Sequence, residues 1–246
     1  MLSSFGRWFK GFFFFPYFSL MDMFHRISDV LRYYIGSGPG PKEFRKTDLA
    51  LTRTYLLRNP YAMCRRHFFS KAFPSAELNQ VQTVYGETLL MTLELINAKL
   101  RINQYDLIMD LGSGRGRNCF FWHAYTQAQV VGVELNPDFV NLANSIRDRF
   151  QLQRLEFVHD NIFDADLSQA TILYFYGVAF SEQATLGLIE KFSQLSPGIV
   201  ILSVGFSLND YYDAPIFVEL ESFEVFFVWG KTRIHVMQTK PQIMTD

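Results

Sequence analysis

The most constraining feature of the sequence is the stretch 105–137, YDLIMDLGSGRGRNCFFWHAYTQAQVVGVELNP. A short apolar run at 107–111 predicts a buried strand, and a glycine-rich loop follows it directly. A helix is expected over about 117–127, and a second apolar strand over 130–133 ends beside Glu134. Strand, glycine loop, helix and strand in this order form the βαβ unit of a doubly wound sheet, which binds its ligand at the carboxyl ends of the strands.

The spacing of the glycines indicates the kind of ligand. Gly112, Gly114 and Gly116 form Gly-x-Gly-x-Gly. A dinucleotide-binding loop places its third glycine one residue later, where this chain has Arg117. Glycines let a ligand approach the main chain closely, and a carboxylate at the tip of the second strand, here Glu134, can take both hydroxyls of a ribose.

Asp110 before the three glycines, with Glu134 after the next strand, resembles motif I of the class I S-adenosylmethionine (SAM) methyltransferases. The resemblance implies that SAM is the cofactor and that the loop holds its methionyl tail and sulfonium, with Asp110 near the cationic end. The cofactor-binding residues that it implies in this stretch are Asp110, Gly112, Ser113, Gly114, Gly116, Glu134 and Leu135.

A second part of the cofactor site is expected after the third strand, which is predicted over 155–159. Asp160, Asn161 and Ile162 follow that strand directly. An acidic residue and then an apolar side chain at this place resemble the adenine site of the methyltransferases. By that resemblance, Asp160 would accept from the exocyclic amine, and Ile162 or Phe163 would pack on the ring.

A Tyr-Gly-Glu-Thr loop precedes an amphipathic helix that is expected over about 89–100. Together with the motifs above, it resembles the non-SET histone lysine methyltransferases of the disruptor-of-telomeric-silencing type, in which the Tyr-Gly-Glu loop closes over SAM. Tyr85, Glu87 and Thr88 would do so here. The alternative is an ordinary N-cap, with Glu87 or Thr88 starting the helix.

The fourth strand, predicted over 170–176, ends where ligands meet in such a sheet. A lysine must reach the methyl group without its proton, and an apolar, aromatic channel lowers the pKa of the amine by desolvation. The candidates for that wall are Tyr174, Tyr176 and Phe180, with packing in the core as the alternative. The histone enzymes carry Asn-Asn-Phe-Ala-Phe at this place, whereas 176–180 reads Tyr-Gly-Val-Ala-Phe here.

Two further segments resemble mitochondrial lysine methyltransferases that act on membrane proteins. Those enzymes carry Phe-Gly-Val after the fourth strand and Glu-Leu-Asn-Pro after the second, matching Tyr-Gly-Val at 176–178 and Glu-Leu-Asn-Pro at 134–137. They also have an apolar N-terminal segment. The Asn/Asp-Pro-Pro-Tyr/Phe box of enzymes that methylate bases or glutamine is absent, which disfavours a planar amide or base as substrate.

The remaining pattern completes the sheet. A fifth strand is expected over 199–204, and the alternating segments 222–229 and 233–239 predict a hairpin. The hairpin supplies strands six and seven, one of them antiparallel. The fold class is therefore α/β, with a doubly wound, Rossmann-like, seven-stranded sheet and an N-terminal helical extension.

Composition divides the 246 residues into four parts. They are an apolar aromatic segment (1–35), a Gly/Pro linker (36–41), a basic helical region (42–74) and the methyltransferase domain (75–246). Thr47 or Asp48 is expected to cap the first basic helix. Residues 41–71 hold eight Lys/Arg against two acidic residues, while the net charge of the chain is -1. Both a polyanionic partner and packing of a basic helix onto the acidic body fit this distribution.

The segment 1–35 has three interpretations. The uncharged run between Lys10 and Asp22 is only eleven residues long, whereas a bilayer span needs about 20. Packing on the catalytic domain, an in-plane anchor on a membrane surface and a targeting segment all remain open. The two cysteines show no Cys/His spacing suited to a metal, so no metal is expected. The protein is expected to be intracellular and cytoplasmic, with membrane association as the alternative.

Three functions are compatible with the sequence. The favoured one is a protein-lysine N-methyltransferase, because in-line transfer from a sulfonium depends mainly on holding amine and methyl group together in a dry site. The second is a methyltransferase for a small molecule or RNA, with residues 42–71 contacting phosphates. The third is a non-catalytic adaptor at a membrane that keeps only the fold.

Overall fold

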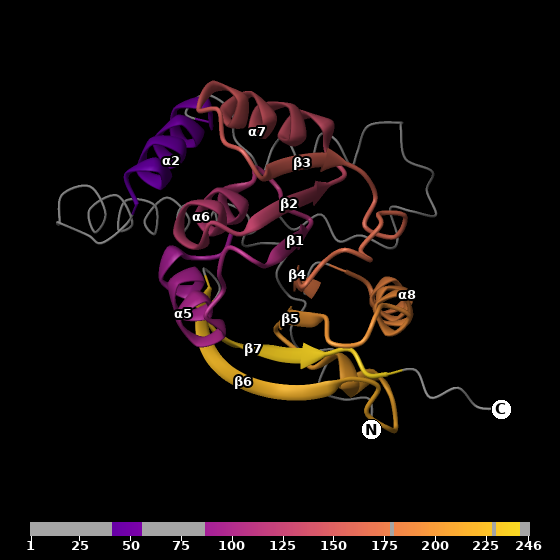
Figure 1. Ribbon diagram of the computed structural model, residues 1–246. Helices are drawn as coiled ribbons and strands as arrows, with labels where there is room; N and C mark the ends of the chain where they lie inside the picture. The colour runs from indigo at the N-terminus through magenta and orange to yellow at the C-terminus, as the bar shows by residue number, and fades with distance from the viewer. Residues whose placement is uncertain (1–40, 56–86, 178–179, 228–229, 242–246) are drawn as a thin grey trace.

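The computed structural model describes residues 41–55, 87–177, 180–227 and 230–241. These residues form a seven-stranded sheet with helices on both faces (Figure 1). The strand order is β3-β2-β1-β4-β5-β7-β6, and β7 pairs antiparallel with both β5 and β6 while the other neighbouring strands pair parallel. The predicted fold class, with one strand running against the rest, is confirmed.

Apart from α2, the helices and strands lie close to their predicted bounds, and the largest shift among them is at the hairpin, which begins at Val218 rather than at 222. Its first residues are exposed, and a register irregularity interrupts the pairing between Glu219 and Glu221, so the alternation that marks a strand is weak there. The described elements are α2 (Lys42–Tyr55), α5 (Leu90–Leu100), β1 (Leu107–Leu111), α6 (Arg117–Thr126), β2 (Gln129–Glu134), α7 (Pro137–Arg149), β3 (Leu155–His159), β4 (Ile172–Phe175), α8 (Glu182–Ser193), β5 (Val200–Val204), a 3-10 turn (Leu208–Tyr211), β6 (Val218–Phe227) and β7 (Gly230–Gln238).

The sheet separates two apolar cores. One lies beneath α5, α6 and α7 and contains the fully buried Trp122 and Phe121. The other lies beneath α8, on the opposite side of the sheet in Figure 1, and contains Phe175 and Phe192. Burial of one such side chain contributes roughly 1.5–3 kcal/mol. The two cores hold the strands in a fixed register, which aligns the carboxyl ends of β1, β2 and β4 at one edge.

Helix α2 starts earlier than predicted. It begins at Lys42, so Thr47 and Asp48 lie inside it and the expected N-cap is wrong. The hydroxyl of Thr47 donates to the carbonyl of Phe44 at 2.9 Å, as serine and threonine do within helices. Phe44 packs edge to face on Phe121 of α6 at 5.6 Å, so α2 belongs to the core beneath α6 and α7.

The rest of the N-terminal region falls outside the described residues. This applies to 1–35, to all but the last residue of the linker, and to the second basic helix expected over 61–72. In the part of the chain that the structure describes, no helix combines the length and the apolar character that crossing a membrane requires.

Candidate cofactor and acceptor site

The glycine loop joins β1 to α6 in a conformation that needs its glycines. Gly112, Gly114 and Gly116 have φ of 83°, 56° and 85°, in the left-handed region that other residues avoid. The amides of Gly112 and Ser113 donate to the carbonyl of Val133 at 2.9 and 3.0 Å, which ties the loop to the end of β2. A Cβ on Gly112 would meet nothing within 4 Å, so this side of the loop is open to a ligand.

The carboxylate of Glu134 is held by the main chain of two loops. Its Oε2 accepts from the amide of Gly114 at 2.8 Å, and its Oε1 accepts from the amide of Asn136 at 2.8 Å. Burial raises the pKa of Glu134, and these two hydrogen bonds oppose the shift. Each carboxylate oxygen has two lone pairs, so each can still accept from one ribose hydroxyl.

Asp110 lies at the end of β1 and is 2% exposed. The thiol of Cys119 donates to its Oδ2 at 3.4 Å. Burial, with a smaller contribution from the charge of Glu134, raises the pKa of Asp110 to about 7. Cys119 is itself fully buried. A cation bound beside Asp110 would favour the carboxylate form, which is the form suited to a sulfonium.

The segment before α5 contacts the glycine loop through Glu87. Both oxygens of this carboxylate accept from Arg115, one from Nη2 at 2.7 Å and one from Nε. The N-cap of α5 is Leu89, which makes no side-chain capping bond, so the expectation that Glu87 or Thr88 caps the helix is wrong. Tyr85 lies outside the described residues, and closure of this loop over SAM stays a prediction.

Thr88 lies deeper, against the aromatic end of β4. Its hydroxyl and that of Tyr174 are 2.7 Å apart, and the amide of Asn118 donates to Thr88 at 3.5 Å. Tyr174 is 1% exposed, and its ring packs edge to face on Trp122 at 5.0 Å. Burial raises the pKa of this phenol. The structure therefore places Tyr174 in the core, which corrects the expectation that it lines an acceptor channel.

The other two candidates for the acceptor wall lie on opposite faces of the sheet. Tyr176 is half-buried, with its ring 5.6 Å from that of Phe227. Phe180 is stacked on Phe175 at 5.5 Å, in the core beneath α8. Side chains two apart on a strand share a face and adjacent ones do not, so Tyr176 shares the face of Tyr174. Tyr176 and Phe180 are both partly buried, and their place in the acceptor wall stays a prediction.

The loop after β3 is arranged by its own side chains. Asp160 accepts from the amide of Asn161 at 2.8 Å, and Asn161 accepts from the amide of Phe163 at 3.1 Å. Ile162 is 7% exposed and packs in the core beneath α8. Leu135, which the resemblance implies as a cofactor-binding residue, is half-buried, and its carbonyl lies 3.0 Å from Nε2 of His159. The structure thus brings the implied adenine residues to the same edge as Glu134.

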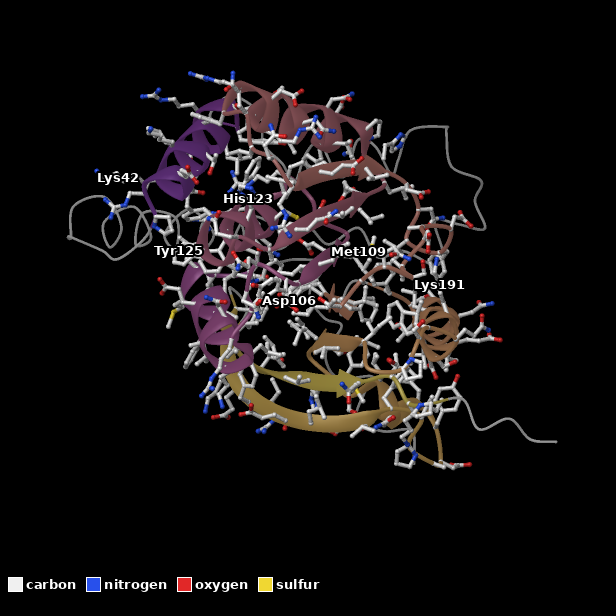
Figure 2. The ribbon with its side chains drawn as sticks, in the orientation of Figure 1. Lys42, Asp106, Met109, His123, Tyr125 and Lys191 are labelled. Atoms are coloured by element: carbon white, nitrogen blue, oxygen red, sulfur yellow. The ribbon has the colours of Figure 1, made fainter. Side chains whose placement is uncertain are left out.

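Lys191 of α8 was not singled out from the sequence, yet it holds this loop (Figure 2). Its ammonium donates to the carbonyls of Ile162, Phe163 and Ala165 at 3.1, 2.7 and 2.6 Å. Burial lowers the pKa of Lys191, although nearby aspartates oppose the shift. One lysine on a helix gives no sequence signal for such a role, because the carbonyls that it binds lie at least 26 residues away.

Within the ranges that the structure describes, no three His, Cys, Asp or Glu side chains are grouped to hold a metal ion. The open face of the glycine loop, the anchored Glu134 and the buried Asp110 lie instead along one edge, at the ends of β1 and β2. Residues 110–213, which include this edge, match the family model of the ANTKMT methyltransferase domain. This part of the chain is therefore similar to a class I SAM-dependent methyltransferase domain.

Solved structures agree with this methyltransferase fold. An RNA methyltransferase from Salinibacter ruber, in complex with S-adenosyl-L-homocysteine, is similar with a TM-score of 0.53 and 23% identity, covering 65% of this chain and 97% of that one. The PH0226 protein from Pyrococcus horikoshii OT3 has a TM-score of 0.50 and 15% identity, with 61% and 89% covered. A search of curated proteins found no match to the sequence.

The residues of the methyltransferase site fit SAM. The cofactor supplies a methyl group on a positively charged sulfur, which leaves as a neutral thioether. With SAM bound, Glu134 would accept from the ribose hydroxyls, the glycine loop would accommodate the methionyl part, and residues 160–162 would hold the adenine. Asp110 is the acidic side chain placed to favour the cation.

Proposed function

We propose that this methyltransferase acts on lysine side chains of proteins. The observation that carries the proposal is the match of residues 110–213 to the ANTKMT methyltransferase domain, which is a lysine methyltransferase family. The matched range runs from Asp110 through the end of β4 to the turn after β5. It therefore includes the cofactor loop and the place where an acceptor would enter.

The end of β4 supports an amine as acceptor. A Cβ on Gly177 would come within 2.5 Å of the Phe206 ring and 2.6 Å of the Phe175 ring, so the main chain here rests on aromatic side chains. Tyr176 lies beside it and packs on Phe227. An ammonium that enters such surroundings loses hydration and with it part of its preference for the charged form. The neutral amine that results is the nucleophile that in-line methyl transfer requires.

Most of the rate is expected to come from positioning. The glycine loop and Glu134 fix the cofactor, and the end of β4 fixes the amine, so that nitrogen and methyl group meet in line. The proton of the incoming ammonium passes to water before transfer. None of the described residues of the site is required as a general base in this scheme.

A transfer assay tests the proposal. The full chain is incubated with SAM labelled with tritium in the methyl group and with cell lysate, and the products are digested with protease or with ribonuclease. We expect label that protease releases and ribonuclease leaves, with methyl-lysine identified by mass spectrometry. Tyr176→Ala should lower transfer while SAM binding is kept, and Ser168→Ala, at an exposed loop position, should change neither. Label found only in RNA would contradict the proposal.

An RNA substrate is the second candidate, and one observation favours it. The exposed side of α2 carries Lys42, Lys46 and Arg53, while its other side is buried. Basic side chains on one face of a helix suit phosphates, and binding through them weakens as salt rises. Charge reversal of Lys42 and Lys46 should abolish labelling of RNA if this candidate is right, and should leave labelling of lysine in place if it is wrong.

We further propose an intracellular protein whose residues 1–35 lie on a membrane surface, from their sequence alone. Sedimentation with vesicles of neutral and anionic lipids tests this, with a chain that starts at residue 36 as the control. Vesicle binding that is equal for both chains would contradict the role of the segment.

A further inference from the structure

The cofactor loop contains two arginines whose side chains are buried. Arg115 stands between Gly114 and Gly116, and Arg117 begins α6. Their exposed fractions are 1% and 6%. A guanidinium stays protonated at any ordinary pH, so a buried arginine needs a carboxylate beside it. In the part of the chain that the structure describes, each of the two arginines has a carboxylate partner from outside the βαβ unit.

Arg117 is paired with helix α2. Its Nε donates to Oδ1 of Asp48 at 2.8 Å, and its Nη2 donates to Oδ2 at 3.3 Å, across 69 residues of sequence. Asp48 is itself 5% exposed. Arg115, which is paired with Glu87, also lies over the ring of Tyr55 in α2, 5.5 Å from its centre. Helix α2 therefore contacts both arginines of the loop.

Apolar packing fixes the place of α2 independently of these charges. The ring of Phe44 lies 5.6 Å from Phe121 and 5.8 Å from Tyr125, both on α6. The ring of Tyr55 lies 6.1 Å from Phe139 on α7. Figure 1 shows α2 alongside these two helices. Asp48 is thus presented to Arg117 by a helix that is already in position.

The charges of the loop matter because the ligand is charged. SAM carries a positive sulfur, whereas its product S-adenosylhomocysteine (SAH) is neutral at that atom. An unpaired guanidinium in a poorly hydrated site would repel SAM and not SAH. Asp48 and Glu87 each place a negative charge against one of these two arginines, which reduces the repulsion that a cationic ligand would meet.

We propose that Asp48 is a positioning residue for the cofactor and acts through Arg117. It holds the junction between the glycine loop and α6, and it cancels a positive charge that would otherwise favour the product over SAM. Helix α2 is then a part of the cofactor site rather than a separate extension. This inference rests on the assignment of SAM as cofactor.

Calorimetric titration of the full chain with SAM and with SAH tests the proposal without any acceptor. In Asp48→Asn we expect SAM to bind roughly tenfold more weakly and SAH about threefold more weakly, because only SAM meets the added repulsion. The matched control is Glu43→Gln, which removes an exposed carboxylate from the same helix. Its affinities should stay within about twofold of the unmodified chain, since an exposed charge is screened.

Two further variants separate charge from packing. Asp48→Glu keeps the charge and should keep the ratio of SAM to SAH affinity even where both affinities fall. The double variant Asp48→Asn/Arg117→Gln removes both charges and should return the ratio toward that of the unmodified chain. If Asp48→Asn does not fold, these two variants still test whether the charge of Asp48 sets the ratio of SAM to SAH affinity.

The proposal is overturned if SAM and SAH lose affinity equally in Asp48→Asn, or if that variant matches Glu43→Gln. An unmodified chain that binds neither ligand would overturn the cofactor assignment itself. Equal losses in a chain that binds both ligands would overturn only the role of Asp48.

Discussion

The two halves of the cofactor site are built in different ways. The ribose half, from Gly112 to Asn136, is held by main-chain amides that donate to Val133 and to Glu134. The loop 160–165, which would hold the adenine, also has main-chain hydrogen bonds, but it is held in addition by side chains, above all by the ammonium of Lys191. Backbone contacts survive most substitutions, whereas a side-chain contact is lost with one. Within the ribose half, substitutions of a glycine or of Glu134 should therefore have the largest effects.

The largest expected effect is that of Gly116→Ala. The residue has φ of 85°, and a Cβ there would collide with the ring of Phe157. Left-handed strain costs about 1–2 kcal/mol and overpacking about 1–3 kcal/mol more, so stability should fall by roughly 2–5 kcal/mol and SAM binding should be lost. Denaturant unfolding measures the first and calorimetry the second.

The control for Gly116→Ala is Gly198→Ala. Gly198 has φ of 95°, but a Cβ there would meet nothing within 4 Å. This variant should show the backbone strain alone and bind SAM normally. Equal destabilisation of the two variants would mean that contact with Phe157 does not shape the loop.

Glu134→Gln comes next. The substitution removes the charge that supports hydrogen bonds from the amides of Gly114 and Asn136 and from the ribose. Loss of charge-assisted bonds costs about 1.5–3 kcal/mol, so SAM affinity should fall roughly ten- to a hundredfold. Glu156→Gln, at an exposed position on β3, is the control and should bind SAM normally. Unchanged SAM affinity in Glu134→Gln would contradict the proposed contact between Glu134 and the ribose.

The pH dependence of SAM binding should report Asp110. Its pKa is about 7 before binding, and SAM favours the carboxylate, so affinity should rise by up to about tenfold between about pH 6 and 8. Asp110→Asn should remove most of that rise.

The contribution of Asp110 to folding stability changes with pH in the opposite direction. A carboxyl whose pKa is raised by folding binds more protons in the folded state, so its contribution to stability falls as pH rises from about 4 to 7. Stability that increases across this range in the native chain but not in Asp110→Asn would contradict the assignment.

The smallest effect is expected for Lys191→Met, and it tests the adenine loop alone. Three hydrogen bonds to carbonyls are lost, and water replaces part of them, so SAM affinity should fall about three- to tenfold. Affinity for an analogue with hypoxanthine in place of adenine should change less. Lys240→Met, which loses a bond to the Pro215 carbonyl far along the chain, is the control. An equal loss of affinity for SAM and for the hypoxanthine analogue would show that Lys191 does not contribute to adenine recognition.

Local signals in the sequence predicted the glycine loop and the place of Glu134 at the end of β2. Gly112, Gly114, Gly116 and Glu134 lie within one βαβ unit, and their roles depend on backbone conformation and on strand ends, which sequence patterns report. The seven-stranded sheet followed from the same patterns. The start of α2 was mistaken because Thr47 and Asp48 have the side chains of an N-cap. Pro41, directly before the helix, is the signal that could have placed it correctly.

Contacts between distant segments could not be predicted. Thr88 meets Tyr174 across 86 residues, and Asp48 meets Arg117 across 69. Such pairs are created by packing of whole elements, and one sequence does not say which acidic residue will face which arginine. For the same reason Tyr174 resembled a residue of the acceptor wall, although the structure buries it against Trp122.

Phe157 makes the conformation of the glycine loop depend on β3, which is an edge strand of the sheet. Its ring occupies the space left by the absent side chains of Gly116 and Gly132, and it is carried by β3, at the margin of the sheet. A marginal strand has a neighbour on one side only and frays before the centre does. The conformation of the glycine loop therefore depends on the pairing of β3 with β2. On heating, we expect cofactor affinity to fall at a lower temperature than that at which the domain unfolds.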